Sequence, residues 1–256
     1  MTWVLRTALT MEQLEAHLPA LEAAGLLGMD EQAGVTSAYF PERAELGVAG
    51  TWEPLPERDW NAEARRRLTA VRVGGLVVTP PWLPQTPPDA VAVVVDPAQA
   101  FGTGHHETTT ACLAALQEVE LAGRTVLDVG TGSGVLAIAA ALLGAGPVLA
   151  VDNDPLAVEA ARHNAARNSV AIEARLATPD EVDGVYDVVL ANLDTATIGA
   201  VAGDLAARLA PGGCLIASGV SVERLDDGVA ALEAAGLVVW ARPGAEWVLL
   251  SARHAS

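Results

Sequence analysis

The feature that most constrains the fold is the regular alternation of short apolar strands and helices that begins at residue 125. Strands are predicted at 125–129, 148–152, 186–191 and 213–218, and helices between them at 134–143, 155–167 and 199–209. Two further strands, Leu237–Ala241 and Glu246–Ala252, predict an antiparallel hairpin. Such alternation is typical of an α/β domain with a Rossmann-like, mostly parallel sheet between two helix layers, in which ligands bind at the carboxyl ends of the strands.

A glycine-rich turn follows the first of these strands and precedes a helix. Glycines allow the backbone to approach a ligand closely, and a helix amino terminus offers free N–H groups to an acidic group. The candidate binding residues of this turn are Asp128, Gly130, Gly132 and Gly134.

The turn alone does not distinguish a nicotinamide dinucleotide from S-adenosylmethionine. Its spacing is G-x-G-x-G, whereas dinucleotide-binding turns have G-x-G-x-x-G. Asp128 lies two residues before the first glycine, where a carboxylate would repel a pyrophosphate but would tolerate a sulfonium with an α-amino group. We therefore expect S-adenosylmethionine as cofactor. The alternative for Asp128 is a structural role in capping the turn.

Polar residues end two other predicted strands. Asp152 comes 22 positions after Gly130 and suits a bidentate contact with ribose hydroxyls, which either cofactor would offer. Asn192 ends the strand at 186–191, and its side-chain amide oxygen could hold a neutral amine by its hydrogens and aim the lone pair at a methyl group. Asn192 is thus the candidate catalytic residue, with turn capping as the alternative.

Charge and composition limit the partners. The net charge of −17 repels nucleic-acid phosphates and attracts a basic partner, so we expect no direct nucleic-acid binding. All 15 basic residues are arginine. A GC-rich genome explains this, and avoidance of self-methylation by a lysine-modifying enzyme is the alternative hypothesis. No signal peptide or membrane span is recognisable, so we expect a cytoplasmic protein.

No metal or disulfide is expected. His105, His106 and Glu107 are consecutive and cannot converge on one ion from a helix. Cys112 and Cys214 have no metal-ligand spacing and are interpreted as reduced, buried thiols.

The first part of the chain predicts a small α+β domain over 1–62. Its expected elements are a strand at Trp3–Leu9, a helix at Met11–Ala24 and a hairpin of Leu26–Met29 with Val35–Phe40. A helical connector is expected within 51–70, and the linker helix is assigned to 63–75. The catalytic domain is assigned to 76–256, with strand-like segments at Val71–Thr79 and Val91–Val95 and a helix from Thr108 to about Val119.

Three segments together resemble one family. The segment Phe101–Thr109 (FGTGHHETT), the glycine-rich Val126–Ala140 and the short Ala191–Leu193 are similar to the bacterial ribosomal protein L11 methyltransferase (PrmA-type) family, a class I S-adenosylmethionine-dependent group. The first segment is specific to that family, and the second is shared by methyltransferases at large. The likeness is dense from about residue 95 to 220.

The resemblance implies a seven-stranded methyltransferase domain joined by a linker helix to a ferredoxin-like domain that binds the substrate. The family trimethylates lysine side chains and the amino-terminal amine of ribosomal protein L11, so the expected partner is this protein, free or on the large subunit, with the enzyme a monomer. Residues that match the family's donor-binding positions are Thr109, Gly130, Asp152 and Asn192. Phe101 and Thr103 lie in a loop that we expect to close over the donor.

The sequence departs from the family pattern at two places, Ala64–Arg67 and Asp194–Thr197. Alternative functions are a methyltransferase acting on another protein or on a small-molecule amine, an NAD-dependent oxidoreductase, and a catalytically silent module that binds S-adenosylmethionine.

Overall fold

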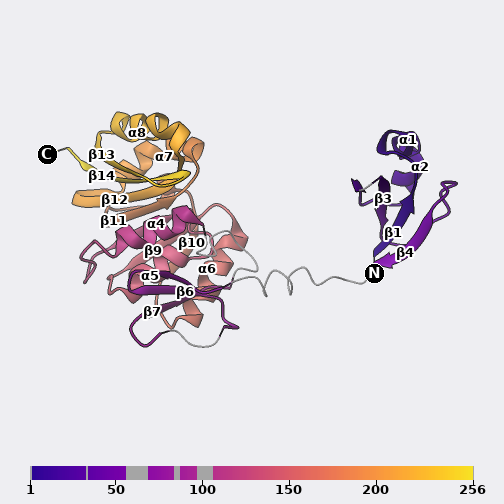
Figure 1. Ribbon diagram of the computed structural model, residues 1–256. Coiled ribbons are helices and arrows are strands. Elements are labelled where there is room, and N and C mark those ends of the chain that lie inside the picture. The colour runs from indigo at the N-terminus through magenta and orange to yellow at the C-terminus, as the bar shows by residue number, and fades with distance from the viewer. Residues whose placement is uncertain (1, 33, 56–68, 84–86, 97–105, 256) are drawn as a thin grey trace. The chain divides into compact units, whose positions relative to one another are not determined.

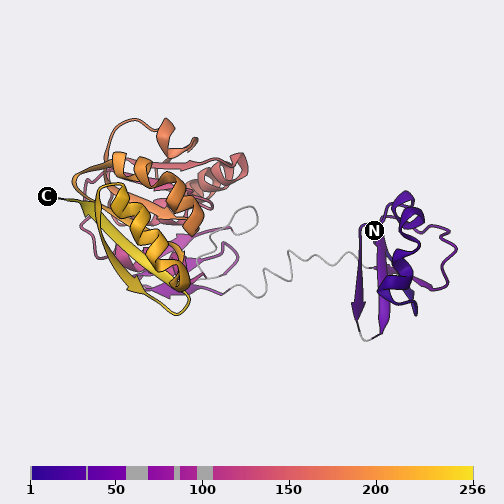
Figure 2. The ribbon, with the colours of Figure 1, turned by 90° about the horizontal axis from the view of Figure 1, so that it is seen from above.

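The computed structural model describes residues 2–32, 34–55, 69–83, 87–96 and 106–255. The chain divides into two compact units, Met1–Arg67 and Leu68–Ser256. Figures 1 and 2 show the two units, and each has its own hydrophobic core.

The N-terminal unit is a four-stranded antiparallel sheet with two short helices. Its order is β2-β3-β1-β4, so the first strand lies inside the sheet between the third and fourth. Leu5, Leu14, Leu21 and Phe40 are fully buried and form the core between the sheet and the helices. The elements are β1 (Thr2–Thr7), α1 (Met11–Glu15), α2 (Leu18–Ala23), β2 (Gly28–Gln32), β3 (Val35–Phe40) and β4 (Thr51–Leu55).

Three sequence predictions for this unit need correction. The helix predicted at 11–24 is two helices, because Pro19 at the start of α2 has no N–H with which to continue the hydrogen bonds of α1. The helical connector predicted within 51–70 is wrong at its start, because Thr51–Leu55 is a strand paired with β1. Trp52 of this strand packs on Phe40 with ring centroids 5.2 Å apart. A ferredoxin-like unit would carry a second helix before β4, but residues 41–50 form none.

The C-terminal unit confirms the Rossmann-like prediction. Its main sheet has seven strands in the order β10-β9-β8-β11-β12-β14-β13. The neighbours from β10 to β12 are parallel, and β14 is antiparallel to both strands beside it. The strands are β8 (Val126–Val129), β9 (Val148–Asp152), β10 (Glu173–Leu176), β11 (Tyr186–Asn192), β12 (Leu209–Ser221), β13 (Leu237–Pro243) and β14 (Trp247–His254).

Helices cover both faces of this sheet (Figure 1). Successive strand residues point to opposite faces, so Val126 joins one core and Leu127 the other. The first core contains α4 (Glu107–Leu116), α5 (Val135–Leu142) and α6 (Pro155–Arg167), and the second contains α7 (Thr195–Ala207) and α8 (Leu225–Ala234). This layering leaves the carboxyl ends of β8, β9 and β11 at one edge.

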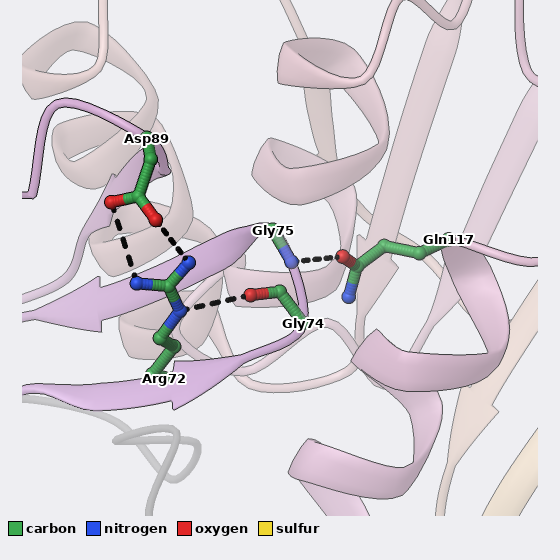
Figure 3. A network of polar contacts seen from close by, with 5 residues as sticks. All are labelled: Arg72, Gly74, Gly75, Asp89 and Gln117. Carbon is green, nitrogen blue, oxygen red and sulfur yellow. Dashed lines mark hydrogen bonds and ion pairs between the residues drawn. The ribbon is translucent and has the colours of Figure 1, made fainter.

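A small three-stranded sheet, β5 (Val71–Val73), β6 (Leu76–Thr79) and β7 (Val91–Val94), packs on the first core. The strand predicted at 71–79 is therefore a tight hairpin that turns at Gly74 and Gly75. Gln117, the residue that ends α4, holds this turn. Its Oε1 accepts from Gly75 N at 2.8 Å (Figure 3), and its Nε2 donates to Val73 O at 3.0 Å. Arg72 beside it pairs with Asp89.

The linker helix assigned to 63–75 is wrong over its described part, because residues 69–70 are not helical and Val71–Val73 is a strand; residues 56–68 lie outside the described part of the chain. Two elements of the main unit were not predicted. Strand β10 lies at the sheet edge with Leu176 exposed, and α8 contains Gly228, which lets it approach Val220 of β12 closely. Among the described residues, no helix is both long enough and apolar enough to cross a membrane.

Candidate active site

A cleft of about 680 Å³ lies where β8, β9 and β11 end. Five of the predicted site residues line it: Thr109, Gly130, Gly132, Asp152 and Asn192. Residues of α4, β9, β11 and the turn after β8 therefore meet at the edge that the strand–helix alternation predicts. Phe101 and Thr103 lie outside the described residues.

The glycine-rich turn forms one wall of the cleft, and two of its glycines are required by close packing. Gly130 has φ +68°, a backbone conformation that favours glycine, and a Cβ there would also clash with the Leu193 side chain. Gly134 has φ +82°, and its Cβ would lie 3.0 Å from Ala161 Cα of α6. Gly134 thus allows α5 to pack against α6 and does not line the cleft, whereas Gly130 and Gly132 do.

Asp152 is fixed by backbone N–H groups on both sides. Its Oδ2 accepts from Gly132 N at 2.9 Å and its Oδ1 from Asp154 N at 3.0 Å. Each carboxylate oxygen can accept a second hydrogen bond, so the side chain retains acceptor capacity toward the cleft. This geometry suits the two adjacent hydroxyls of a ribose.

Asp128 lies beneath the turn and does not line the cleft; its side chain is 1% exposed. Its Oδ2 accepts from Thr131 Oγ1 at 2.6 Å and from Ala137 N at 3.2 Å, which ties the turn to α5. Burial raises the pKa of Asp128 to about 6, although both hydrogen bonds oppose this rise. The geometry matches the capping alternative. Its Oδ1 is buried and has no hydrogen-bond partner within the described chain.

Asn192 ends β11 and contacts the first turn of α4. Its Nδ2 donates to Thr109 Oγ1 at 3.2 Å, and Thr109 is fully buried. This bond fixes the orientation of the amide and leaves Oδ1 without a partner in the described part of the chain. The pair therefore presents an acceptor at the strand end, beside the glycine turn.

Sequence reasoning missed several residues of the cleft, among them His106, Thr108, Gly219 and Trp247. Trp247 begins β14 and packs against His106 with ring centroids 5.1 Å apart and ring planes at 62°. His106 caps α4 by accepting from Thr108 N. The sequence around Trp247 does not indicate that its side chain lines a cleft. This position depends on the pairing of β14 with β12.

Asp194, part of the atypical segment after Asn192–Leu193, is a helix cap. Its carboxylate accepts from Thr197 Oγ1 at 2.7 Å and from the backbone N–H groups of Ala196 and Thr197 at the start of α7. These hydrogen bonds, that of the Thr197 hydroxyl above all, lower the pKa of Asp194. The departure from the family pattern is thus a stable amino-terminal cap.

No group of three potential metal ligands occurs among the described residues. Both cysteines are buried and unpaired, and burial raises the pKa of the Cys112 thiol well above its ordinary value. Neither is suited to act as a nucleophile at neutral pH.

Comparison with known proteins identifies the family. The family model described as "Ribosomal protein L11 methyltransferase (PrmA)" matches residues 11–255. The chain belongs to this family. A ribosomal protein L11 methyltransferase of Deinococcus radiodurans is 40% identical, with 94% of each chain covered, and that of Thermus thermophilus is 38% identical over 97% of this chain and 98% of the relative. The crystal structure of a ribosomal protein L11 methylase from Lactobacillus delbrueckii covers 73% of this chain and 99% of its own, with 30% identity and a TM-score of 0.69.

Membership of the PrmA family makes the chain a class I methyltransferase with S-adenosylmethionine as methyl donor. The site fits this cofactor. Glycines without side chains form one wall of the cleft, and Asp152 lines it with spare acceptor capacity for ribose hydroxyls.

Proposed function

We propose that this enzyme methylates lysine side chains and the amino-terminal α-amine of ribosomal protein L11. The observation that carries the proposal is the extent of the similarity: relatives named ribosomal protein L11 methyltransferase match 94% and 97% of the chain, so the N-terminal unit is included. A methyltransferase for a different substrate would need the donor site but not that unit.

In this proposal the donor is held across β9, β8 and β11. Asp152 accepts from the ribose hydroxyls, and Gly130 and Gly132 give the backbone close access. A smaller hollow of about 110 Å³ adjoins the cleft, and its lining includes Val129, Ala177 and Pro179. This mostly apolar lining suits the flat adenine ring of the donor. Thr109 supports Asn192, and Asp128 holds the turn from beneath. Phe101 and Thr103, which lie outside the described residues, are proposed as further donor contacts.

When bound, S-adenosylmethionine supplies a methyl group on a positively charged sulfur, which an amine lone pair attacks from the opposite side. Asn192 Oδ1 accepts a hydrogen bond from the amine N–H and so directs the nitrogen lone pair toward the methyl group. The rigidity needed for this alignment comes from the hydrogen bond between Asn192 and Thr109. Enclosure of the amine in the cleft disfavours its charged form and lowers its pKa, so no dedicated base is required.

The N-terminal unit is proposed to recognise L11. The net charge of −17 favours association with a basic protein surface. We further propose that the enzyme works as a monomer, accepts L11 free or on the large subunit, and makes no direct contact with nucleic acid.

The decisive experiment incubates purified L11, and separately large ribosomal subunits, with the enzyme and labelled S-adenosylmethionine. Mass spectrometry should find methyl groups on lysines and on the amino terminus of L11. Because the enzyme contains no lysine, every methyl-lysine detected comes from the substrate. Donor binding by calorimetry without any methylated L11 would reject the substrate, and absence of donor binding would reject the enzyme class.

A further inference from the structure

The strand order of the main sheet fixes the sequence in which the cleft residues lie along its edge. Following the sheet, Asp152 ends β9, the turn with Gly130 follows β8, and Asn192 ends β11. Beyond them come Gly219 of β12 and Trp247, which pairs with Ser221 at the far end of β12. If the donor occupies the side from β9 to β11, the amine enters from the side of Trp247.

Trp247 is held in place by two contacts at the amino terminus of α4. The His106 ring packs on its indole, and Glu107 accepts from Ala245 N at 2.7 Å and from Glu246 N at 3.4 Å in the turn just before it. A fixed aromatic side chain therefore lines the amine's side of the cleft. An aromatic face holds the methyl groups of a neutral dimethylated amine by apolar contact, and it attracts the positive charge that develops on nitrogen during the transfer through cation–π interaction.

In each transfer an N–C bond forms as the C–S bond of the donor breaks, and the resulting ammonium loses a proton to water before it can react again. Successive methylation therefore removes the hydrogens that Asn192 can use. A neutral primary amine has two N–H groups, a monomethylated amine has one, and a dimethylated amine has none. The amide oxygen of Asn192 can therefore direct the first and second transfers but has nothing to accept from in the third. A third transfer needs a holder that does not depend on N–H groups.

We propose that Trp247 is this holder: its indole positions the dimethylated amine for the last transfer, whereas Asn192 positions the amine in the first two. This inference rests on the proposed function, because it assumes that L11 amines are trimethylated. It divides one reaction between two positioning residues on different strands of the cleft, according to the hydrogens that remain on nitrogen.

The test follows the three transfers to L11 by time-resolved mass spectrometry with saturating S-adenosylmethionine, giving rate constants k1, k2 and k3. We expect Trp247→Leu to lower k3/k1 about tenfold and Trp247→Phe to keep it within about threefold, because phenylalanine retains an aromatic face. Asn192→Ala should instead lower k1 and k2 more than k3. Should the leucine variant fail to fold, Trp247→Met supplies the same loss of aromaticity.

Trp240→Leu is the matched control. Trp240 lies on the neighbouring strand β13, is 56% exposed and does not line the cleft, so its loss should leave k3/k1 unchanged. Donor affinity should stay within about twofold in the Trp247 variants, since the donor contacts are at the other end of the cleft.

An unchanged k3/k1 in Trp247→Leu, an equal loss in Trp247→Phe, or a wild type that stops at two methyl groups would each overturn this inference. A wild type that binds donor but leaves L11 unmodified would overturn the proposed function instead.

Discussion

At the scale of single residues, the hydrogen bond between Asn192 and Thr109 is the contact on which methyl transfer should depend most. Asn192→Ala removes the acceptor and lets the amine rotate, so we expect single-turnover transfer to slow about a hundredfold while donor affinity changes less than about threefold. Rapid-quench kinetics and calorimetry measure the two quantities.

Thr109 provides a control for the orientation of the amide. Thr109→Val keeps the shape but removes the hydroxyl that accepts from Asn192, and Thr109→Ser restores it. The valine variant should be slow and the serine variant close to wild type. Unchanged single-turnover rates in Asn192→Ala would show that the amide does not direct the amine.

Asp128 predicts a specific pH dependence of stability. Its folded-state pKa is raised by burial from 3.8 to about 6, so between these values the folded state binds more protons than the unfolded state. Stability from this group is therefore present below about pH 4 and is lost as pH rises through about 6. In urea titrations we expect the wild type to lose free energy of unfolding relative to Asp128→Asn over this interval. Parallel curves for the two proteins would contradict the buried charge.

The sequence identified those site residues whose position follows from the sheet alone. Asp152 and Asn192 were predictable because parallel strands bring their carboxyl ends to one edge. Asp128 was ambiguous, since the sequence does not say which side of the turn a carboxylate occupies. Trp247 was missed because its place depends on the antiparallel pairing of β14 with β12, which connects residues far apart in sequence.

At the scale of elements, Glu107 joins the start of α4 to the β13–β14 turn. Replacing it with alanine removes the acceptor for Ala245 N and Glu246 N, so hydrogen exchange of both amides should accelerate about tenfold or more. Because Trp247 loses its support, k3, the rate constant of the third methyl transfer, should fall several-fold. In Glu107→Gln, which retains an acceptor oxygen, the two amides should exchange much more slowly than in the alanine variant. Equal protection in all three proteins would mean that the turn is stable without Glu107.

Elements with strong periodicity were predicted well, whereas those stabilised by their surroundings were not. The buried strands β8, β9 and β11 each contain a short apolar run that predicts a strand and nothing else. By contrast, Thr51–Leu55 becomes a strand because β1 offers it a free edge and Phe40 offers Trp52 a surface. The hairpin of β5 and β6 depends on Gln117, which is more than 40 positions away in the chain.

At the scale of the whole molecule, the two units differ in what they can do alone. The C-terminal unit holds every cleft residue described and two cores of its own, while the N-terminal unit has a separate core around Leu5 and Phe40. The strand and helix pattern, together with the family resemblance, predicted two parts. The second helix that a ferredoxin-like unit would carry is not formed by residues 41–50, which contain no periodic pattern that could have tested it.

This separation permits a test of what the N-terminal unit contributes. A protein comprising residues 68–256 should retain S-adenosylmethionine affinity within about threefold, because no donor contact is removed. Its kcat/KM for L11 should fall at least about a hundredfold, since the substrate would have to find the cleft without a docking surface. At saturating concentrations of a short peptide carrying one lysine, full-length and truncated enzymes should methylate at similar rates, because such a peptide bypasses docking. Full activity of the truncated enzyme toward L11 would assign recognition to the cleft alone and favour the alternative of a small-molecule or general protein methyltransferase.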